Sequence, residues 1–523
     1  MKVFFKKHGK LLLAAFLLSL LPLICCLVHC GVQGYSIWDV YLPASEWNDE
    51  LFYFKQVEGI LEFGYPYGYF GFNESHAAKL SFAAWSPVLV IPWVLWGIIF
   101  GWNLLSPIWC NIFLMGAAIF LFVLLVKPQK KQMLTLAVLY CLFPMFTRYI
   151  LSGMPEIFCF SIAIVFYGIA VSYLQEKASK SKLIWLFILS AVMTLMRPYL
   201  LLMMFLPAYL WIIQTKKWSS LIGSAAIMAG SFGGYVLIHT QLGAEYLEPL
   251  FSVDWVDVML EEGLFKGIQF VLYTIADKGI QFMGAVIEAF RSGYANGIYF
   301  AVFLAAFVIL IVQFVQSLRQ KNKNECVIVG HAVFAFLGIL AALLLMFRIH
   351  DGKRHFMTFM AVGIFLISLL RTKYYIKAVI LGGLCFYLFT IKADSPMDFQ
   401  VPFADAERVE WMQYWEETFQ KEMEIDYKDV PNYNNCVIWV LTDSKEGEQP
   451  VLTEWQALYG IPAGMGISCC HSQYVNENLD QLKCRYIVTL SEGTVDRNCQ
   501  EKGFVEIGRK GNVVAYEKNT ICD

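Results

Sequence analysis

The chain is dominated by a series of apolar segments that are separated by short basic loops. About eleven segments are roughly 15 to 22 residues long, which as helices suits a hydrocarbon core about 30 Å thick. They cover residues 11–31, 106–126, 132–150, 156–174, 183–197, 198–214, 218–238, 297–318, 325–347, 356–370 and 377–391. Hydrophobic residues make up 58% of the 523 residues, and the mean hydropathy is +0.55. This pattern predicts an α-helical polytopic membrane protein and gives no support for a nucleic-acid partner.

The positions of Lys and Arg predict how the chain is oriented in the membrane. Four Lys residues precede the first apolar segment, and the positive-inside rule places them in the cytosol. We expect this segment to be retained, because it lacks a good cleavage pattern of small residues. Counting from a cytoplasmic N-terminus also leaves five basic loops inside, at 127–131, 177–182, 216–217, 319–323 and 371–377. The expected location is the plasma membrane, with several spans.

One further apolar segment, residues 86–102, is interpreted differently. Counting it as a span would place the basic loop 127–131 outside the cell, so we expect it to be re-entrant or interfacial. Pro87 and Pro92 are typical of a broken helix.

The predicted topology divides the chain into two domains. Residues 1–391 form a transmembrane domain, whose first outer loop covers 31–85 and continues in juxtamembrane segments to 103. Residues 392–523 form a small extracytoplasmic α/β domain, because their apolar blocks shorten to the length of strands. We expect strands at 436–441, 485–490 and 513–516, and helices at 406–424 and 454–459.

The cysteines follow the same division. Eight of the 14 Cys lie in or next to the apolar segments, where Cys acts as a small apolar residue, and six lie in the outer domain. The even number outside the membrane permits disulfides, but the connectivity cannot be deduced from the sequence.

Three carboxylates are candidates for chemistry on the outer face. Asp49 and Glu50 lie in the first outer loop, and Glu156 begins a later span at the same face. A carboxylate near the membrane surface can act as a general base or help to hold a divalent cation. The alternatives are that Asp49 and Glu50 are solvated loop acids, and that Glu156 is a helix-terminal acid stabilised by the macrodipole.

A late outer turn, residues 348–355, is unusually basic for that side. Arg348, Lys353, Arg354 and His355 are candidates for binding a phosphate, because Arg offers paired donors to phosphate oxygens. The alternative is a cytoplasmic loop in a miscounted topology. Arg148 and Arg197 are weaker candidates at other span ends.

This order of features resembles the GT-C superfamily of integral-membrane glycosyltransferases, which use polyprenyl-phosphate-linked sugars. The resemblance covers residues 1 to about 391. It rests on Asp49-Glu50, the segment Trp85-Ser86-Pro87, the second acid Glu156 and the late basic turn. The branches that it resembles are the dolichyl-phosphate-mannose-protein mannosyltransferases and the aminoarabinose transferases.

The resemblance implies a role for each matched residue. Asp49 would be the catalytic base or lie beside it, Glu50 would be its neighbour, and Glu156 would complete the acidic site. Arg348, Lys353, Arg354 and His355 would bind the donor phosphate. The acceptor would be a cell-surface glycan, a lipid or a protein. A divalent cation, Mg or Mn, is possible.

Two other functions remain open from the sequence. The same charges could line the path of a transporter or flippase of a lipid-linked saccharide, although no internal repeat is evident and the charges lie at span ends. A membrane-anchored assembly protein would need neither Asp49 nor Glu156.

Overall fold

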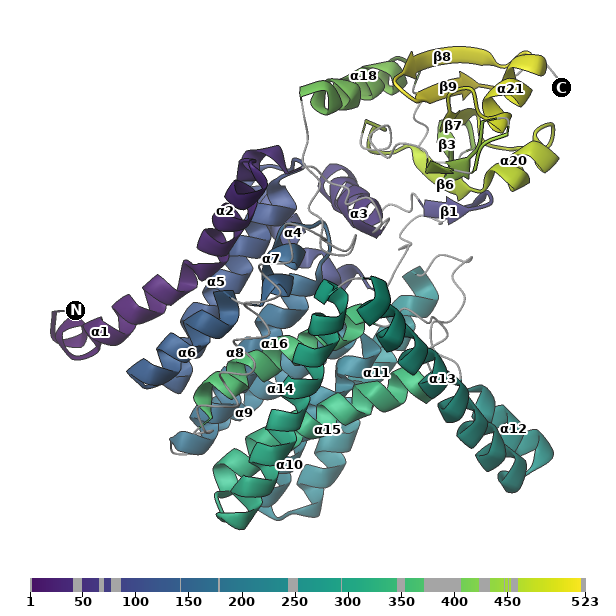
Figure 1. Cartoon of the computed structure of the whole chain (residues 1–523). Coiled ribbons are helices and arrows are strands. Elements are labelled where there is room, and N and C mark those ends of the chain that lie inside the picture. Colours follow the sequence, from purple (N-terminus) through teal and green to yellow (C-terminus); the bar gives the residue numbers. More distant parts are fainter. Residues whose placement is uncertain are drawn as a thin grey trace.

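The computed structural model describes residues 2–40, 49–64, 70–76, 86–141, 143–176, 179–242, 253–292, 294–345, 353–370, 406–422, 433–445, 447–449, 451–452 and 460–518. Within these ranges, six helical stretches are long and apolar enough to cross a membrane. The helices form one bundle, and a small domain with a β-sheet lies at one end of it (Figure 1). The predicted fold class, a helical membrane protein with a small α/β domain, is confirmed.

Helix α8 (Glu156–Gln175) lies at the centre of the bundle. It is the most buried of the candidate spans, because 72% of the residues in its 18-residue apolar stretch lie inside the protein. It packs against α5 (Ser106–Val126), α9 (Lys180–Met196) and α16 (Lys353–Leu369). The other helices of the bundle's second half are η3 (Pro198–Met204), α10 (Phe205–Thr215), α11 (Trp218–Leu242), α14 (Tyr294–Arg319) and α15 (Lys323–Leu345).

A buried histidine in this core is fully engaged. His331 of α15 shares a hydrogen bond of 2.8 Å between its Nδ1 and the Tyr167 hydroxyl of α8. Its Nε2 lies 3.2 Å from the carbonyl oxygen of Leu202. The histidine therefore joins three elements in a region where an unsatisfied polar group would be costly.

Several predicted segments are divided or shortened, mostly at prolines. Segment 11–31 consists of α1 (Lys2–Ser19) and α2 (Leu21–Gln33), and segment 132–150 consists of α6 (Lys130–Cys141) and α7 (Pro144–Ile150). Proline lacks the amide proton that would continue the helix, and it stands in the first turn of α2 and α7. Segment 377–391 lies outside the described residues.

Residues 86–102 fold as η2 (Pro87–Leu89) and the 10-residue helix α4 (Ile91–Phe100). At 1.5 Å per residue, α4 is about 15 Å long, half of the hydrocarbon core. The expectation of a broken helix is confirmed, and a re-entrant or interfacial position of this segment stays a prediction.

The regions predicted outside the membrane contain further helices. They are η1 (Ile37–Asp39), α3 (Asp49–Phe63), α12 (Asp254–Glu262), α13 (Leu264–Ser292) and α18 (Ala406–Glu422). Helix α3 lies between the bundle and the C-terminal domain (Figure 1). The predicted helix 406–424 is confirmed as α18, and the predicted helix 454–459 lies outside the described residues.

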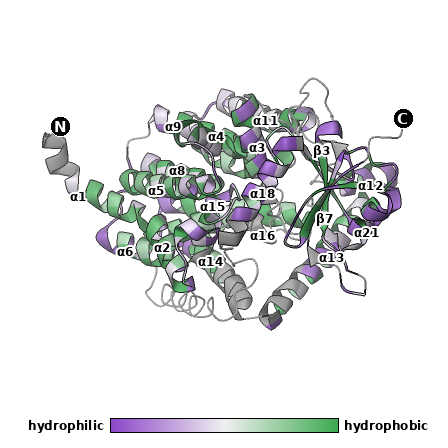
Figure 2. Ribbon diagram, turned by 90° about the horizontal axis from the view of Figure 1, so that it is seen from above, coloured by the Kyte–Doolittle hydropathy of each residue, from purple (hydrophilic) through white to green (hydrophobic). Residues whose placement is uncertain are grey.

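The C-terminal sheet has seven strands in the order β2-β1-β6-β3-β7-β9-β8. Strands β1, β6, β3 and β7 are parallel, and the remaining pairs are antiparallel. In Figure 2 the strands at the centre of this sheet are hydrophobic, while the elements around the sheet carry hydrophilic residues. The bounds are β1 (Phe70–Phe72), β2 (Ser75–His76), β3 (Cys436–Val440), β6 (Gly466–Cys470), β7 (Tyr486–Leu490), β8 (Val505–Lys510) and β9 (Val513–Glu517).

Smaller elements complete this domain. They are η5 (Tyr433–Asn435), the two-stranded pair β4 (Thr442–Asp443) and β5 (Val451–Leu452), and the helices α20 (Ser472–Asn478) and α21 (Thr494–Glu501). The three strands expected from the sequence are confirmed as β3, β7 and β9. The described cysteines form no disulfide, although the Sγ atoms of Cys436 and Cys484 are 3.2 Å apart.

The first outer loop supplies two strands of this sheet, which the sequence did not indicate. Phe70 pairs with Ile467 at the start of β1, and Glu74 anchors the turn that follows. The Glu74 carboxylate is buried and accepts hydrogen bonds from the amides of Lys483 at 2.6 Å and Cys484 at 2.8 Å. Its own amide donates to Ser468 Oγ at 2.8 Å. Glu74 therefore joins the loop to the C-terminal domain.

We expect Glu74→Ala to detach this loop, because it leaves the Lys483 amide and the buried Cys484 amide without their acceptor. The loss should be about 1.5–3 kcal/mol, the range for a hydrogen bond to a charged group. It should appear as a lower melting temperature of the purified protein and as faster proteolysis within 65–85. Glu448→Gln, at an exposed acid of the same domain, is the control. Equal melting and cleavage in both variants would contradict the anchoring role.

Candidate functional site

A buried cluster of four polar side chains lies where three helical segments meet at one end of the bundle. The Arg197 guanidinium makes an ion pair with Glu156 through Nη2. Its Nη1 donates to the Tyr199 hydroxyl at 3.0 Å and lies 3.2 Å from His355 Nδ1. The Tyr199 hydroxyl is 3.0 Å from the same nitrogen. Arg197, Glu156 and His355 are each 1% exposed.

The local sequence explains how these side chains converge. Arg197 ends α9 because the following Pro198 disfavours a helical conformation before it, and Arg197 is extended at φ −148°. The chain then turns into η3, which brings Tyr199 next to Arg197. Glu156 is the first residue of α8, and His355 lies in the first turn of α16. Each charged or polar group thus stands at the end of an element.

The geometry fixes the protonation of His355. A guanidinium has only donors, so the His355 Nδ1 that faces it must be the acceptor. The neutral imidazole therefore carries its proton on Nε2. The cluster as described contains one cation and one anion, which compensate each other in a buried place.

One oxygen of the Glu156 carboxylate is unsatisfied. Oε1 accepts from Arg197, whereas Oε2 is buried and has no hydrogen-bond partner among the described residues. Because buried polar atoms are nearly always paired, this oxygen is positioned to accept a proton donor such as a ligand hydroxyl or a water.

Glu50 brings the first outer loop to the same end of the bundle. It is fully buried, and its Oε1 accepts a hydrogen bond of 3.1 Å from the amide of Gly153, three residues before Glu156. A Cβ at Gly153 would lie 3.1 Å from the Glu50 Cβ. Glycine therefore permits the close approach between α3 and this turn.

Helix α3 contacts both the bundle and the C-terminal domain. Tyr53, one turn after Glu50, is buried in the bundle core and close enough to Arg197 to interact with it electrostatically. Phe52 belongs to the core of the C-terminal domain. The buried Lys55 ammonium donates to the carbonyl oxygen of Ile461 at 2.6 Å and pairs with Glu58 at 2.8 Å. The α3 helix thus joins the cluster to the domain.

The structure brings some of the predicted residues together. Glu50 and Glu156 lie on neighbouring segments, and His355 meets Glu156 through Arg197. Asp49 begins α3, but its side chain lies outside the described part. The same holds for Lys353 and Arg354, which begin α16, and Arg348 lies outside the described residues altogether.

Two residues of the polar cluster were not main candidates in the sequence analysis. Arg197 was a weaker candidate and proves to be the centre of the cluster, while Tyr199 was not considered. The available signal was an Arg between two apolar segments, directly before Pro198. Arg148, the other weaker candidate, is buried in α7, which packs against α2.

The described residues do not fit a metal site. They contain no group of three His, Cys, Asp or Glu side chains that could hold an ion. Glu50 and Glu156 each use one oxygen for a protein partner, the Gly153 amide and Arg197 respectively. The divalent cation, Mg or Mn, stays a prediction.

No family model and no curated protein matches the sequence. Among solved structures, the chain is similar to the Archaeoglobus fulgidus oligosaccharyltransferase in complex with Zn and sulfate, at 12% identity, covering 92% of this chain and 68% of that one, with a TM-score of 0.48. It is also similar to ArnT from Cupriavidus metallidurans in the apo state, at 8% identity over 96% and 97% of the two chains, with a TM-score of 0.42.

We expect Arg197 and Glu156 to be strongly coupled. Removing either charge leaves its buried partner uncompensated, so Arg197→Gln and Glu156→Gln should each lower the free energy of unfolding by about 3–5 kcal/mol. The double variant should lose much less than the sum, with a coupling energy of about 0.5–3 kcal/mol. Unfolding of the purified variants in detergent gives the four values of the cycle.

The matched control pairs Arg197→Gln with Glu176→Gln. Glu176 follows the other end of α8, about 30 Å away at 1.5 Å per residue. These two changes should be additive within about 0.5 kcal/mol. Additivity in the Arg197 and Glu156 cycle as well would mean that the ion pair does not organise the cluster.

Proposed function

We propose that the protein is a membrane glycosyltransferase that moves a sugar from a polyprenyl-phosphate donor to an acceptor at the extracytoplasmic surface. The observation that carries this proposal is the buried cluster of Glu156, Arg197, Tyr199 and His355 beside Glu50. The cluster supports the proposal because it combines an acid with a guanidinium, the kind of group that suits a phosphate, at one end of the bundle. The resemblance of the sequence to the GT-C superfamily supports the same reaction class.

The reaction is a displacement at the anomeric carbon. The acceptor heteroatom forms a bond to that carbon, and the bond between the carbon and the phosphate oxygen breaks. Its electron pair leaves with the polyprenyl phosphate, while a carboxylate takes the acceptor proton. A single displacement inverts the configuration at this carbon relative to the donor.

Asp49 is the proposed base, and Glu50 holds it in place. Asp49 is the first residue of α3, and the adjacent Glu50 fixes this helix end through the amide of Gly153. Glu50 itself is fully buried, which suits a positioning role. The unsatisfied Oε2 of Glu156 is available to a hydroxyl of the sugar or the acceptor.

The start of α16 is the proposed site for the departing phosphate. Lys353, Arg354 and His355 occupy the first turn, where the helix macrodipole is positive. Arg197 contacts His355 and would add its guanidinium charge beside the phosphate oxygens. The charges of Lys353, Arg354 and Arg197 would stabilise the negative phosphate as the sugar leaves.

The test is transfer of labelled sugar from a polyprenyl-phosphate donor pool in membranes that contain matched amounts of each variant. Asp49→Asn should lower the transfer rate roughly a hundredfold or more, the scale for removal of a general base. Glu62→Gln, at an exposed acid on the same helix, should transfer like the wild type.

Full transfer by Asp49→Asn would exclude Asp49 as the base. If the wild type transfers no sugar but moves the lipid-linked saccharide from one leaflet to the other, the protein is a flippase. If the wild type shows neither activity and Asp49→Asn still assembles normally in the membrane, an assembly role is favoured.

A further inference from the structure

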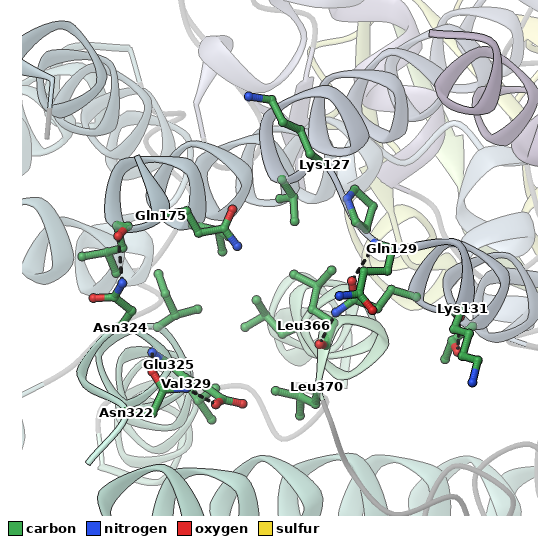
Figure 3. A pocket seen from close by; sticks show the side chains of 18 of the residues that line it. Lys127, Gln129, Lys131, Gln175, Asn322, Asn324, Glu325, Val329, Leu366 and Leu370 are labelled. Carbon is green, nitrogen blue, oxygen red and sulfur yellow. Dashed lines mark hydrogen bonds between the residues drawn. The ribbon is translucent and has the colours of Figure 1, made fainter. Parts of the chain in front are cut away.

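A second cavity lies at the end of the bundle opposite the polar cluster. Its volume is about 1010 Å³. It is bounded by the end of α5, the start of α6, the end of α8, the segment before and at the start of α15, and the end of α16 (Figure 3). Helix α8 runs from Glu156 in the cluster to Gln175 at this cavity, about 30 Å away at 1.5 Å per residue.

The walls of this cavity are mainly apolar, and its edge is polar. Aliphatic side chains line it from four helices: Val138, Val171, Leu174, Ile328, Leu366 and Leu370 close its sides. Figure 3 shows the amide groups of Gln175, Asn324 and Gln129 around the opening, with Lys127 and Lys131 farther out. Apolar walls of this extent favour a hydrocarbon chain over water.

The surroundings of the opening are strongly basic. Each of the three loops 127–131, 177–182 and 319–323 contains three Lys or Arg residues, and only two carboxylates, Glu176 and Glu325, lie beside them. Glu176 pairs with Lys127 and Lys182, which brings the first two loops together. The Asn324 amide donates to the Leu174 carbonyl at 2.8 Å and brings the third loop to the same place.

The second carboxylate, Glu325, also lines the cavity, but the three loops together carry nine Lys and Arg residues against these two acids. Glu325 accepts hydrogen bonds from the Gln313 amide at 2.6 Å and the Asn322 amide at 2.7 Å. Lys131 is exposed at the edge of the cavity. A ligand that combines a hydrocarbon chain with a negative head group complements both parts of the site.

We propose that this cavity binds an anionic phospholipid, with an acyl chain between the apolar walls and the phosphate near Lys131 and Lys127. Basic pockets between helices at the cytoplasmic face are suited to such head groups. The lipid would come from the leaflet opposite the polar cluster, which the charge distribution predicts to be the cytoplasmic leaflet. It would connect the far ends of α8 and α16, the two helices whose other ends carry Glu156 and His355.

The test is native mass spectrometry of the full chain in detergent, titrated with phosphatidylglycerol or phosphatidylcholine of the same acyl chains. The wild type should retain phosphatidylglycerol more tightly. Lys131→Gln should weaken this binding roughly fivefold, the effect of one basic residue near an anionic head group. Lys217→Gln, at an exposed basic residue away from the cavity, should bind like the wild type. Val138→Trp should weaken both lipids by filling the cavity.

A second measurement does not depend on how the variants fold. Phosphatidylglycerol with a photoreactive acyl chain should label peptides from 134–138 and 366–370 of the wild type. Labelling only elsewhere, or equal retention of the two lipids, would overturn the proposal. Because neither readout involves sugar transfer, a failed glycosyltransferase assay leaves this result interpretable.

Discussion

The ion pair between Arg197 and Glu156 is the interaction on which the arrangement of one end of the bundle depends. Both side chains are almost completely buried, and neither charge is tolerable there without the other. The pair fixes the start of α8 against the junction of α9 and η3. His355 and Tyr199 then fill the remaining positions around the guanidinium, so the start of α16 is fixed as well.

Helix α3 extends this constraint beyond the membrane domain. Glu50 holds its first turn against Gly153, Tyr53 packs in the bundle, and Phe52 packs in the core of the C-terminal domain. A displacement of the C-terminal domain would therefore reach the cluster through one short helix. This arrangement explains why Lys55, on the same helix, is buried and hydrogen-bonded to Ile461.

The sequence predicts the parts of this structure that depend on local pattern. Long apolar segments locate most candidate spans, prolines indicate the short helix α4, and short apolar blocks locate β3, β7 and β9. It also identifies Glu156, because an acid at the end of a span is unusual. The partner of that acid could not be deduced, since Arg197 is 41 residues away and only tertiary packing brings the two together. The anchoring role of Glu74 was hidden for the same reason, because its partners lie near residue 483.

The strand that the first outer loop lends to the C-terminal sheet has a consequence for biogenesis. Phe70 pairs with Ile467, so about three quarters of the chain must be made between the two halves of this contact. At about 5–20 residues per second, the loop waits roughly 20 to 80 s for its partner. During that time β1 can pair with β2 of the same loop, but its other edge lacks β6, and strand edges of this kind invite pairing with other chains. The unpaired edge of β1 must therefore be protected from other chains until the last quarter of the protein has been synthesised and β6 pairs with it.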